Sequence, residues 1–299
     1  MKRVLVIGAT GNIGRQVVSQ LLATNVSVRA LVRNPDSASL PAAVEMVRGD
    51  LTTPATLDRP LDDLDAVFLV WVAPRTAVAA AVARIAERVP RIVFLSSPHR
   101  TAHPFFQQPG WRPGERMANP FAKLQAEIER LIEASGAQWT FLRPGMFAAN
   151  TLLWWAPQIR AGNVVRWPNA AAPTAPIHEL DIAAVAARAL CEEGHGGEDC
   201  VLTGPQSLSL FEQVSTIGEA IGRPLRFQEI SPEEARLELA AVMPPPVVGM
   251  LLNAFAAGIG QPAFVTSTVA DVTGRPARTF RDWVIDNAAE FRRRSPKGA

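Results

Sequence analysis

The chain opens with a predicted strand, a glycine-rich turn and a helix, RVLVIGATGNIG at residues 3–14. The apolar run at 4–7 predicts a strand buried on both faces, and helical periodicity follows from residue 13. Between them lie three evenly spaced glycines, Gly8, Gly11 and Gly14. Glycine lets the backbone turn sharply and approach a pyrophosphate, while the new helix offers free N–H groups and its positive dipole end. The pattern therefore predicts a nucleotide site, with a tight turn that binds nothing as the alternative.

Composition excludes several other classes of protein. A net charge of +2 over 299 residues gives no basic field of the kind that nucleic-acid binders use. The two cysteines, Cys191 and Cys200, cannot form a disulfide framework, and no Cys/His spacing suggests a metal site. No stretch reaches the ~18 apolar residues of a membrane helix, and the first residues lack a signal-peptide pattern. We expect a cytoplasmic monomer or homodimer that binds a small-molecule substrate.

Strand and helix patterns alternate along the first half of the chain. Strands are expected at 26–32, 44–47, 66–72, 91–97 and 139–142, with helices at 76–89 and 121–132. This alternation predicts an α/β fold with a doubly wound parallel sheet of the Rossmann type.

The domain organisation follows from where the alternation becomes irregular. We place the nucleotide-binding core at 1–150 and expect 176–204 to return to the sheet as a helix and a seventh strand. The remaining residues, 151–175 and 205–299, are expected to form a smaller, interleaved substrate-binding region. Within it, 232–260 looks helical but is broken by prolines, as in a lid or pocket wall.

Parallel strands end at one edge of a sheet, and ligands of such sheets bind there. We therefore expect the segments that follow the predicted strands to converge on one cleft. They contribute the glycine turn and Arg33, Asp50, Leu51, Trp71, Val72, Ser96, Ser97, Pro144, Gly145, Met146 and Phe147.

Arg33 bears on which nucleotide binds. NAD sites usually hold the ribose hydroxyls with an acidic residue after the second strand, but this chain has Arg33 there and no carboxylate before Asp36. A guanidinium suits a 2′-phosphate because it is planar and permanently charged. The sequence thus favours NADPH, with NADH possible and a solvated surface arginine as the alternative.

Several motifs together resemble the NmrA-like branch of the atypical short-chain dehydrogenase/reductases. They are GATGNIG, the RNP after the second strand, GDL, LSS, the helix with Lys123, GAQWTFLRPG and the C-terminal GRPARTF. The branch includes quinone oxidoreductases, azoreductase-like enzymes, isoflavone reductases and ergot-alkaloid iminium reductases. It also includes NmrA itself, a nucleotide-binding regulator.

The resemblance implies roles for individual residues. Arg33 matches the 2′-phosphate contact, and Asp50 with Leu51 the adenine contact. Lys123 matches the lysine beside the nicotinamide ribose, and the turn Pro144, Gly145, Met146, Phe147 borders the nicotinamide. The phosphate loop matches Gly8, Thr10, Gly11, Asn12, Ile13 and Gly14.

One departure from the family bears on the reaction. Short-chain dehydrogenases use a tyrosine four residues before the lysine to protonate an alkoxide, whereas this chain has Asn119 there and no tyrosine at all. The loss shifts the expected substrates toward acceptors that need little protonation of oxygen. An iminium carbon accepts hydride directly, and a reduced quinone can take its protons from water. A quinone, an iminium ion or an enone is the expected kind of substrate.

Each remaining candidate has a structural alternative. Lys123 could simply pair with Glu127 on an exposed helix face, and Ser97, at the position of the family's serine, could be ordinary turn chemistry. His99, His103 or His178 could supply a proton, or be polar loop residues. Phe147, Trp154 and Trp155, with Asn150 at the start of the pocket region, could contact a flat substrate or belong to the core.

The leading hypothesis is an NADPH-dependent reductase of a small conjugated or aromatic substrate. Catalysis would come mainly from positioning and exclusion of water, with Lys123, Ser97, Asn119 and His178 as candidate catalytic residues. The alternative is a nucleotide-binding sensor without turnover, and a non-redox isomerase or cyclase is a third hypothesis.

Overall fold

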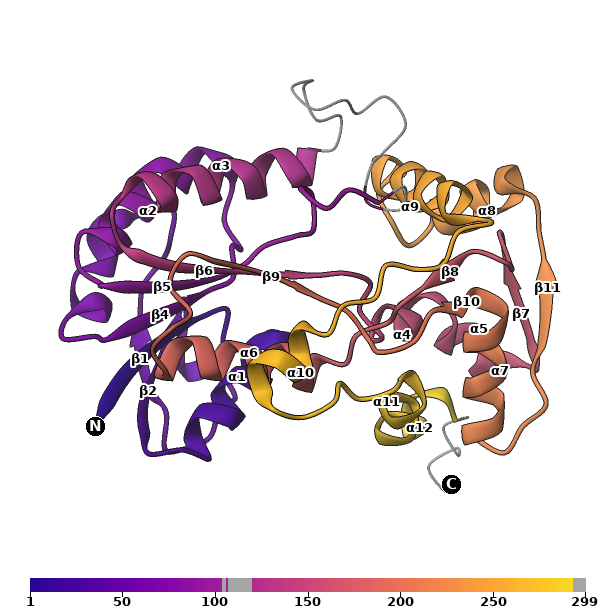
Figure 1. Cartoon of the computed structure of the whole chain (residues 1–299), viewed down its shortest axis with the longest axis horizontal. Helices are drawn as coiled ribbons and strands as arrows, with labels where there is room; N and C mark the ends of the chain where they lie inside the picture. Colours follow the sequence, from indigo (N-terminus) through magenta and orange to yellow (C-terminus); the bar gives the residue numbers. More distant parts are fainter. Residues whose placement is uncertain (104–105, 107–119, 293–299) are drawn as a thin grey trace.

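The fold is built on one seven-stranded parallel sheet in the order β3-β2-β1-β4-β5-β6-β9 (Figure 1). The computed structural model describes residues 1–103, 106 and 120–292. The predicted α/β class and parallel sheet are confirmed. The strands are β1 (Lys2–Ile7), β2 (Val26–Val32), β3 (Glu45–Arg48), β4 (Ala66–Leu69), β5 (Arg91–Leu95), β6 (Gln138–Pro144) and β9 (Glu198–Leu202).

Helices cover both faces of this sheet because its central strands alternate between two cores. Val4 and Val6 of β1 pack with α1 (Asn12–Leu22) and α6 (Glu179–Cys191). Leu5 and Ile7 point the other way, into the core formed with α2 (Val78–Ala86) and α3 (Pro120–Ala134). The strand order reverses between β1 and β4, which places a topological switch point beside the glycine turn.

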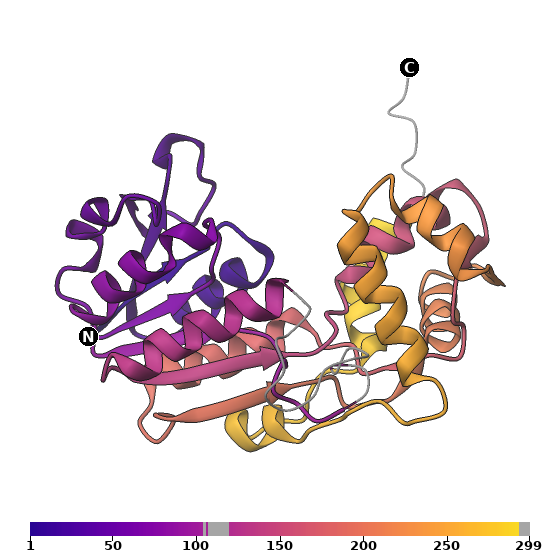
Figure 2. The same cartoon turned by 90° about the horizontal axis from the view of Figure 1, so that it is seen from above.

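Residues 150–174 and 205–292 lie mainly beside the sheet as a second part of the molecule (Figure 2). Its core holds six fully buried aromatic side chains, Trp155, Trp167, Trp283, Phe255, Phe280 and Phe291. Its strands form two small sheets, β7 (Val164–Trp167) with β11 (Arg226–Glu229) and β8 (Pro173–Thr174) with β10 (Leu208–Ser209). Its helices are α4 (Asn150–Trp154), α5 (Ala156–Ala161), α7 (Leu210–Ala220), α8 (Pro232–Leu239), α9 (Pro245–Gly258), α11 (Phe280–Asp286) and α12 (Ala288–Phe291).

The two parts are interleaved in sequence. Residues 179–202 return to the sheet as α6 and β9, and α10 (Thr268–Thr273) packs against both of them. Val269 of α10 belongs to the sheet core rather than to the second core. Thus one helix of the 205–299 segment supports the nucleotide-binding part.

Several elements are shorter than the sequence predicts. The strand expected at 66–72 ends at Leu69, because its neighbour β1 leaves the sheet at the Gly8 turn. The strand expected at 91–97 ends at Leu95, and the helix expected at 76–89 spans Val78–Ala86. Within the described ranges, no helix is long and apolar enough to cross a membrane.

Candidate active site

The glycine turn between β1 and α1 has the geometry of a phosphate cradle. Gly8 adopts a φ of +87°, which favours glycine, and its carbonyl oxygen accepts a 3.0 Å hydrogen bond from the Gly11 N–H. A Cβ at Gly14 would lie 2.7 Å from the Gly8 carbonyl carbon, so only glycine lets α1 pack this closely on the turn. A Cβ at Gly11, by contrast, would meet only the Gly8 oxygen, at 3.3 Å, so the space beside this part of the loop is open.

The amino end of α1 is open to an anion. No described side chain caps its first N–H groups, and its first turn carries no acidic residue. Instead, the Asn12 side chain donates a 3.1 Å hydrogen bond to Glu179 of α6, and the Thr10 carbonyl accepts one from Arg15. Ile13 is buried in the core below. The free N–H groups and the dipole of α1 therefore fit a pyrophosphate.

Arg33 and Asp50 lie near one another where β2 and β3 end. The N–H and hydroxyl of Thr52 and, to a smaller extent, the Arg33 charge hold the pKa of Asp50 below its usual range. Arg33 is exposed, so its guanidinium is available to a 2′-phosphate. Leu51 is only 3% exposed, which leaves its backbone as the part that an adenine could contact.

Arg29 of β2, four residues before Arg33, has a different role. Its side chain is nearly buried, pairs with Glu45 at 2.8 Å and donates to the backbone carbonyls of Pro60 and Asp62. It therefore holds the loop at 59–62 against the sheet and is not available to a cofactor.

The turn after β6 lies at the carboxyl edge of the sheet, between the ends of β5 and the edge strand β9. The Gly145 N–H donates to the Leu202 carbonyl of β9 at 2.8 Å, and Phe147 bridges to Ile177. These bonds fix the 144–147 turn between the sheet and the second part of the molecule. Pro144, Gly145, Met146 and Phe147 all line one cavity of about 630 Å³.

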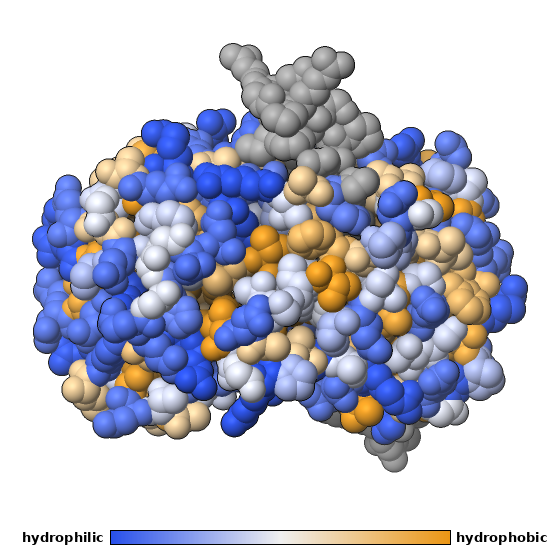
Figure 3. Space-filling model, in the orientation of Figure 1, coloured by the Kyte–Doolittle hydropathy of each residue, from blue (hydrophilic) through white to orange (hydrophobic). Residues whose placement is uncertain are grey.

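This cavity has one polar end and apolar walls. Ser96, Ser97, His99 and Asn150 supply its polar side chains, near the ends of β5 and β6. None of the described residues that line it is Lys or Arg. The space-filling view shows apolar side chains gathered near the middle of the molecule, where its two parts meet (Figure 3). The apolar wall is formed by Phe106, Phe121, Leu153, Trp154, Val242, Met243, Val247, Met250, Leu251 and Ala254, among others.

Glu129 of α3 lies directly behind the polar end of the cavity, fully buried. Arg143 of β6 donates to both of its oxygens at 3.0 and 2.9 Å, and Ser96 donates at 2.5 Å. The His99 Nε2 lies 3.2 Å from Oε2. Burial alone would raise the pKa of Glu129, but the bonds from His99, Arg143 and Ser96 outweigh it and lower the pKa to about 2. The carboxylate is therefore ionised at neutral pH.

Some predicted site residues lie away from this cavity. Trp155 is fully buried in the second core, so the expected substrate contact is wrong for its side chain, whereas its neighbour Trp154 lines the cavity. His178 caps α6 by accepting from the Leu180 N–H at 3.2 Å, and its Nε2 lies 3.3 Å from Asp286. These contacts give His178 a structural role, outside the cavity lining.

Several other predicted site residues are not among those that line the cavity. Lys123 is half-buried on α3, and Glu127 bonds to Arg75 at 2.6 Å rather than to Lys123. Trp71 donates to the Ala73 carbonyl at 2.6 Å, and Val72 is 67% exposed. Asn119 lies outside the described residues.

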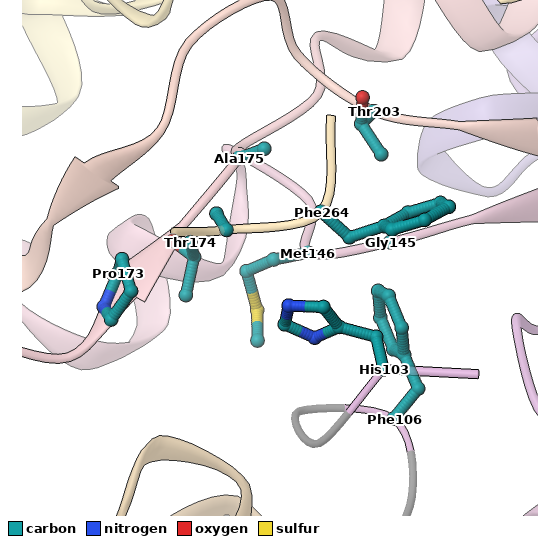
Figure 4. A pocket seen from close by; sticks show the side chains of 10 residues that line it. His103, Phe106, Gly145, Met146, Pro173, Thr174, Ala175, Thr203 and Phe264 are labelled. Carbon is teal, nitrogen blue, oxygen red and sulfur yellow. The ribbon is translucent and has the colours of Figure 1, made fainter. Parts of the chain in front are cut away.

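A second, much smaller pocket adjoins the same turn. Gly145 and Met146 line it together with His103, Phe106 and Phe264 (Figure 4). The His103 Nε2 contacts the Pro262 carbonyl at 3.1 Å, and its ring lies 5.8 Å from that of Phe264. With a volume of about 10 Å³ this pocket holds a water molecule at most, so it is not a substrate site.

Sequence reasoning missed two contributors to the site. The first is the set of side chains from residues 242–254, although the segment itself was expected to form a pocket wall. The second is Glu129, for which a signal exists, because it falls on the same helix face as Gln125, Ile128 and Ile132. A carboxylate on an otherwise buried stripe indicates buried partners.

Comparison with known proteins agrees with this geometry. A family model described as NAD(P)H-binding matches residues 8–193. A reductase of Streptomyces griseus, named for (4-alkanoyl-5-oxo-2,5-dihydrofuran-3-yl)methyl phosphate, is 38% identical over 96% of this chain and 99% of its own. The NAD(P)H azoreductase of Xenophilus azovorans is 33% identical over the same shares. The structure of an NADPH-dependent quinone oxidoreductase from Escherichia coli has the same fold, with a TM-score of 0.78 at 23% identity over 95% of this chain and 99% of that one.

Proposed function

The chain belongs to the NAD(P)H-binding family as an NADPH-dependent oxidoreductase, and on that premise we propose that it reduces a small, uncharged or cationic, conjugated acceptor. Quinones, iminium ions and enones are the classes intended. The observation that carries the proposal is the cavity of about 630 Å³ that opens at the 144–147 turn, where the sheet edge meets α9.

The cofactor site supports this proposal at three points. The Gly8 turn and the uncapped end of α1 fit a pyrophosphate, and exposed Arg33 beside Asp50 fits a 2′-phosphate. The 144–147 turn then lies where a nicotinamide would face the cavity. When bound, NADPH supplies the hydride, and the protein's own residues position the acceptor and exclude water.

The lining of the cavity supports the choice of acceptor. Flat apolar molecules fit between Trp154, Phe147 and the α9 side chains, with their polar atoms toward Ser97 and Asn150. The S. griseus reductase is named for a phosphate ester, but the described lining here offers no Lys or Arg to such a group. We therefore propose that this chain takes acceptors without a phosphate.

Steady-state kinetics with NADPH test the proposal. The acceptors are menadione, 2-cyclohexenone and a cationic triarylmethane dye, which represent quinones, enones and electrophilic carbocations. We expect NADPH oxidation with at least one of them, and phosphate esters should be poorer acceptors than their neutral alcohols. A protein that binds NADPH but oxidises none of it across this panel would instead be a nucleotide sensor.

A further inference from the structure

Three side chains lie in line from the cavity into the protein at the end of β5. The Ser97 hydroxyl oxygen faces the His99 Nδ1 at 3.3 Å, and the His99 Nε2 faces the Glu129 Oε2 at 3.2 Å. Ser97 and His99 line the cavity, whereas the Glu129 side chain is fully buried. The line thus joins the acceptor site to an ionised internal carboxylate.

The two ring nitrogens of His99 lie close to oxygens of Ser97 and Glu129. The Nδ1 lies 3.0 Å from the Ser97 backbone carbonyl and 3.3 Å from its hydroxyl, and the Nε2 lies 3.2 Å from the Glu129 Oε2 without a hydrogen bond to a described residue. The backbone carbonyl can only accept, so the Nδ1 is the nitrogen that carries a proton toward Ser97, and a second proton on the Nε2 would lie next to the carboxylate. The side chain of His99 is only 4% exposed, which protects that arrangement from competition by water.

The charges around His99 also favour a cation. The negative charges are the carboxylates of Glu129 and Glu133 of α3 and Asp199 of β9. The positive charges are the guanidinium groups of Arg100, next to His99, and Arg143 of β6. Arg143 bonds to Asp199 at 2.9 Å and Arg100 to Glu133 at 3.2 Å. Three carboxylates therefore face two guanidinium groups, so the cluster has one excess negative charge, which would attract a proton on His99.

We propose that Ser97, His99 and Glu129 form a proton relay that takes the place of the missing tyrosine when the acceptor is an enone. The inference rests on the proposed function. Ser97 is the catalytic residue, because it lines the cavity that would hold the acceptor, and His99 and Glu129 act through it as positioning residues.

The step balances in protons and electrons. Hydride addition to the β carbon of an enone places two electrons on the acceptor and leaves a negative enolate oxygen. Ser97 gives its hydroxyl proton to that oxygen and takes the Nδ1 proton of His99, whose imidazolium becomes neutral. Water then returns one proton to His99. Overall, NADPH, the enone and one proton are consumed. The products are NADP⁺ and an enol, which tautomerises to the saturated ketone.

Acceptors with different proton demands test the relay. A cationic triarylmethane dye takes hydride directly and needs no proton, whereas 2-cyclohexenone needs one. We expect Ser97→Ala and His99→Gln to lower kcat for the enone by about 10²-fold, the lower end of general acid catalysis. Their loss of kcat should be at least tenfold smaller for the dye than for the enone, and their Kd for NADPH, measured by fluorescence, should stay within twofold of the wild type. The control His195→Gln, on the loop before β9, should change none of these values.

Each other outcome contradicts a defined part of the account. Equal losses with enone and dye would mean that the two variants damage the site as a whole, and unchanged enone kinetics would remove the relay directly. A wild type that reduces the dye or menadione but no enone would also overturn the relay, while leaving the proposed reductase intact. A wild type that binds NADPH and reduces none of the three would overturn the proposed function, and the relay with it.

Discussion

We propose that the choice between NADPH and NADH depends on Arg33. Its exposed guanidinium lies near Asp50, and no carboxylate holds that position for ribose hydroxyls. Because a hydrogen bond to a charged group is worth about 1.5–3 kcal/mol, Arg33→Gln should raise the Kd for NADPH about 10- to 100-fold. The Kd for NADH serves as the control, since NADH lacks the 2′-phosphate. Equal weakening of both nucleotides in a fluorescence titration would contradict this assignment.

A second residue, Glu129, makes the stability of the fold sensitive to acid. Its pKa of about 2 lies below that of an unfolded glutamate, so it stabilises the fold above about pH 4.3 and loses this contribution as pH falls toward 2. Glu129→Gln keeps the volume but leaves Arg143 without its buried partner, and should cost about 3–5 kcal/mol at pH 7.

Urea unfolding of the wild type and Glu129→Gln at several pH values measures this contact. The difference between the two proteins should narrow between pH 4.5 and pH 2.5. Glu133→Gln, whose carboxylate is one-third exposed, should change stability by less than about 1 kcal/mol at any pH. A Glu129→Gln difference that stays constant on acidification would show that the charge does not stabilise the fold.

At the scale of elements, the junction of β1 and α1 depends on Gly14. A Cβ there would overlap the Gly8 carbonyl group, so Gly14→Ala must push the helix away from the turn. We expect the free energy of unfolding to fall by about 1–3 kcal/mol. We also expect NADPH binding to become too weak to measure. Gly249→Ala, in open space on α9, should instead stabilise the protein by about 0.5–1 kcal/mol. Normal NADPH affinity in Gly14→Ala would argue against the cradle.

Helix α9 is the second element with a defined task, since it forms the cavity wall opposite the sheet edge. Val247 lines the cavity and is 39% exposed, so a larger side chain can enter the space without disturbing the core. Val247→Trp should raise the KM for menadione at least about tenfold and leave the Kd for NADPH unchanged. Leu237→Trp on α8, 79% exposed, is the matched control. An unaltered KM in Val247→Trp would place the acceptor elsewhere.

For the whole molecule, the sequence predicted what depends on local periodicity. The glycine spacing and the alternating strands and helices predicted the sheet, and the family match confirms an NAD(P)H-binding protein. The pairing of β7 (Val164–Trp167) with β11 was not predicted, because the two strands are about sixty residues apart and no local signal joins them.

The polar end of the site was harder to predict, because it is assembled from distant segments. Trp154 and Trp155 are adjacent in sequence, yet one lines the cavity and the other is core, which only the packing of the second part decides. In the same way, the sequence indicated His99 as a candidate proton donor. It did not indicate that Glu129 lies next to it, because Glu129 belongs to α3 and only the fold brings the two together. The roles of Lys123 and Asn119 remain predictions.

Transfer of deuterium from NADPH labelled at the reactive C4 position tests the central claim most directly. The cationic triarylmethane dye is a suitable acceptor, because hydride adds to its central carbon and cannot exchange with water afterwards. If the cavity holds the acceptor against the nicotinamide, mass spectrometry will find one deuterium in each molecule of reduced dye. Reduced dye without deuterium, or bound labelled NADPH that stays unoxidised beside the dye, would contradict the account.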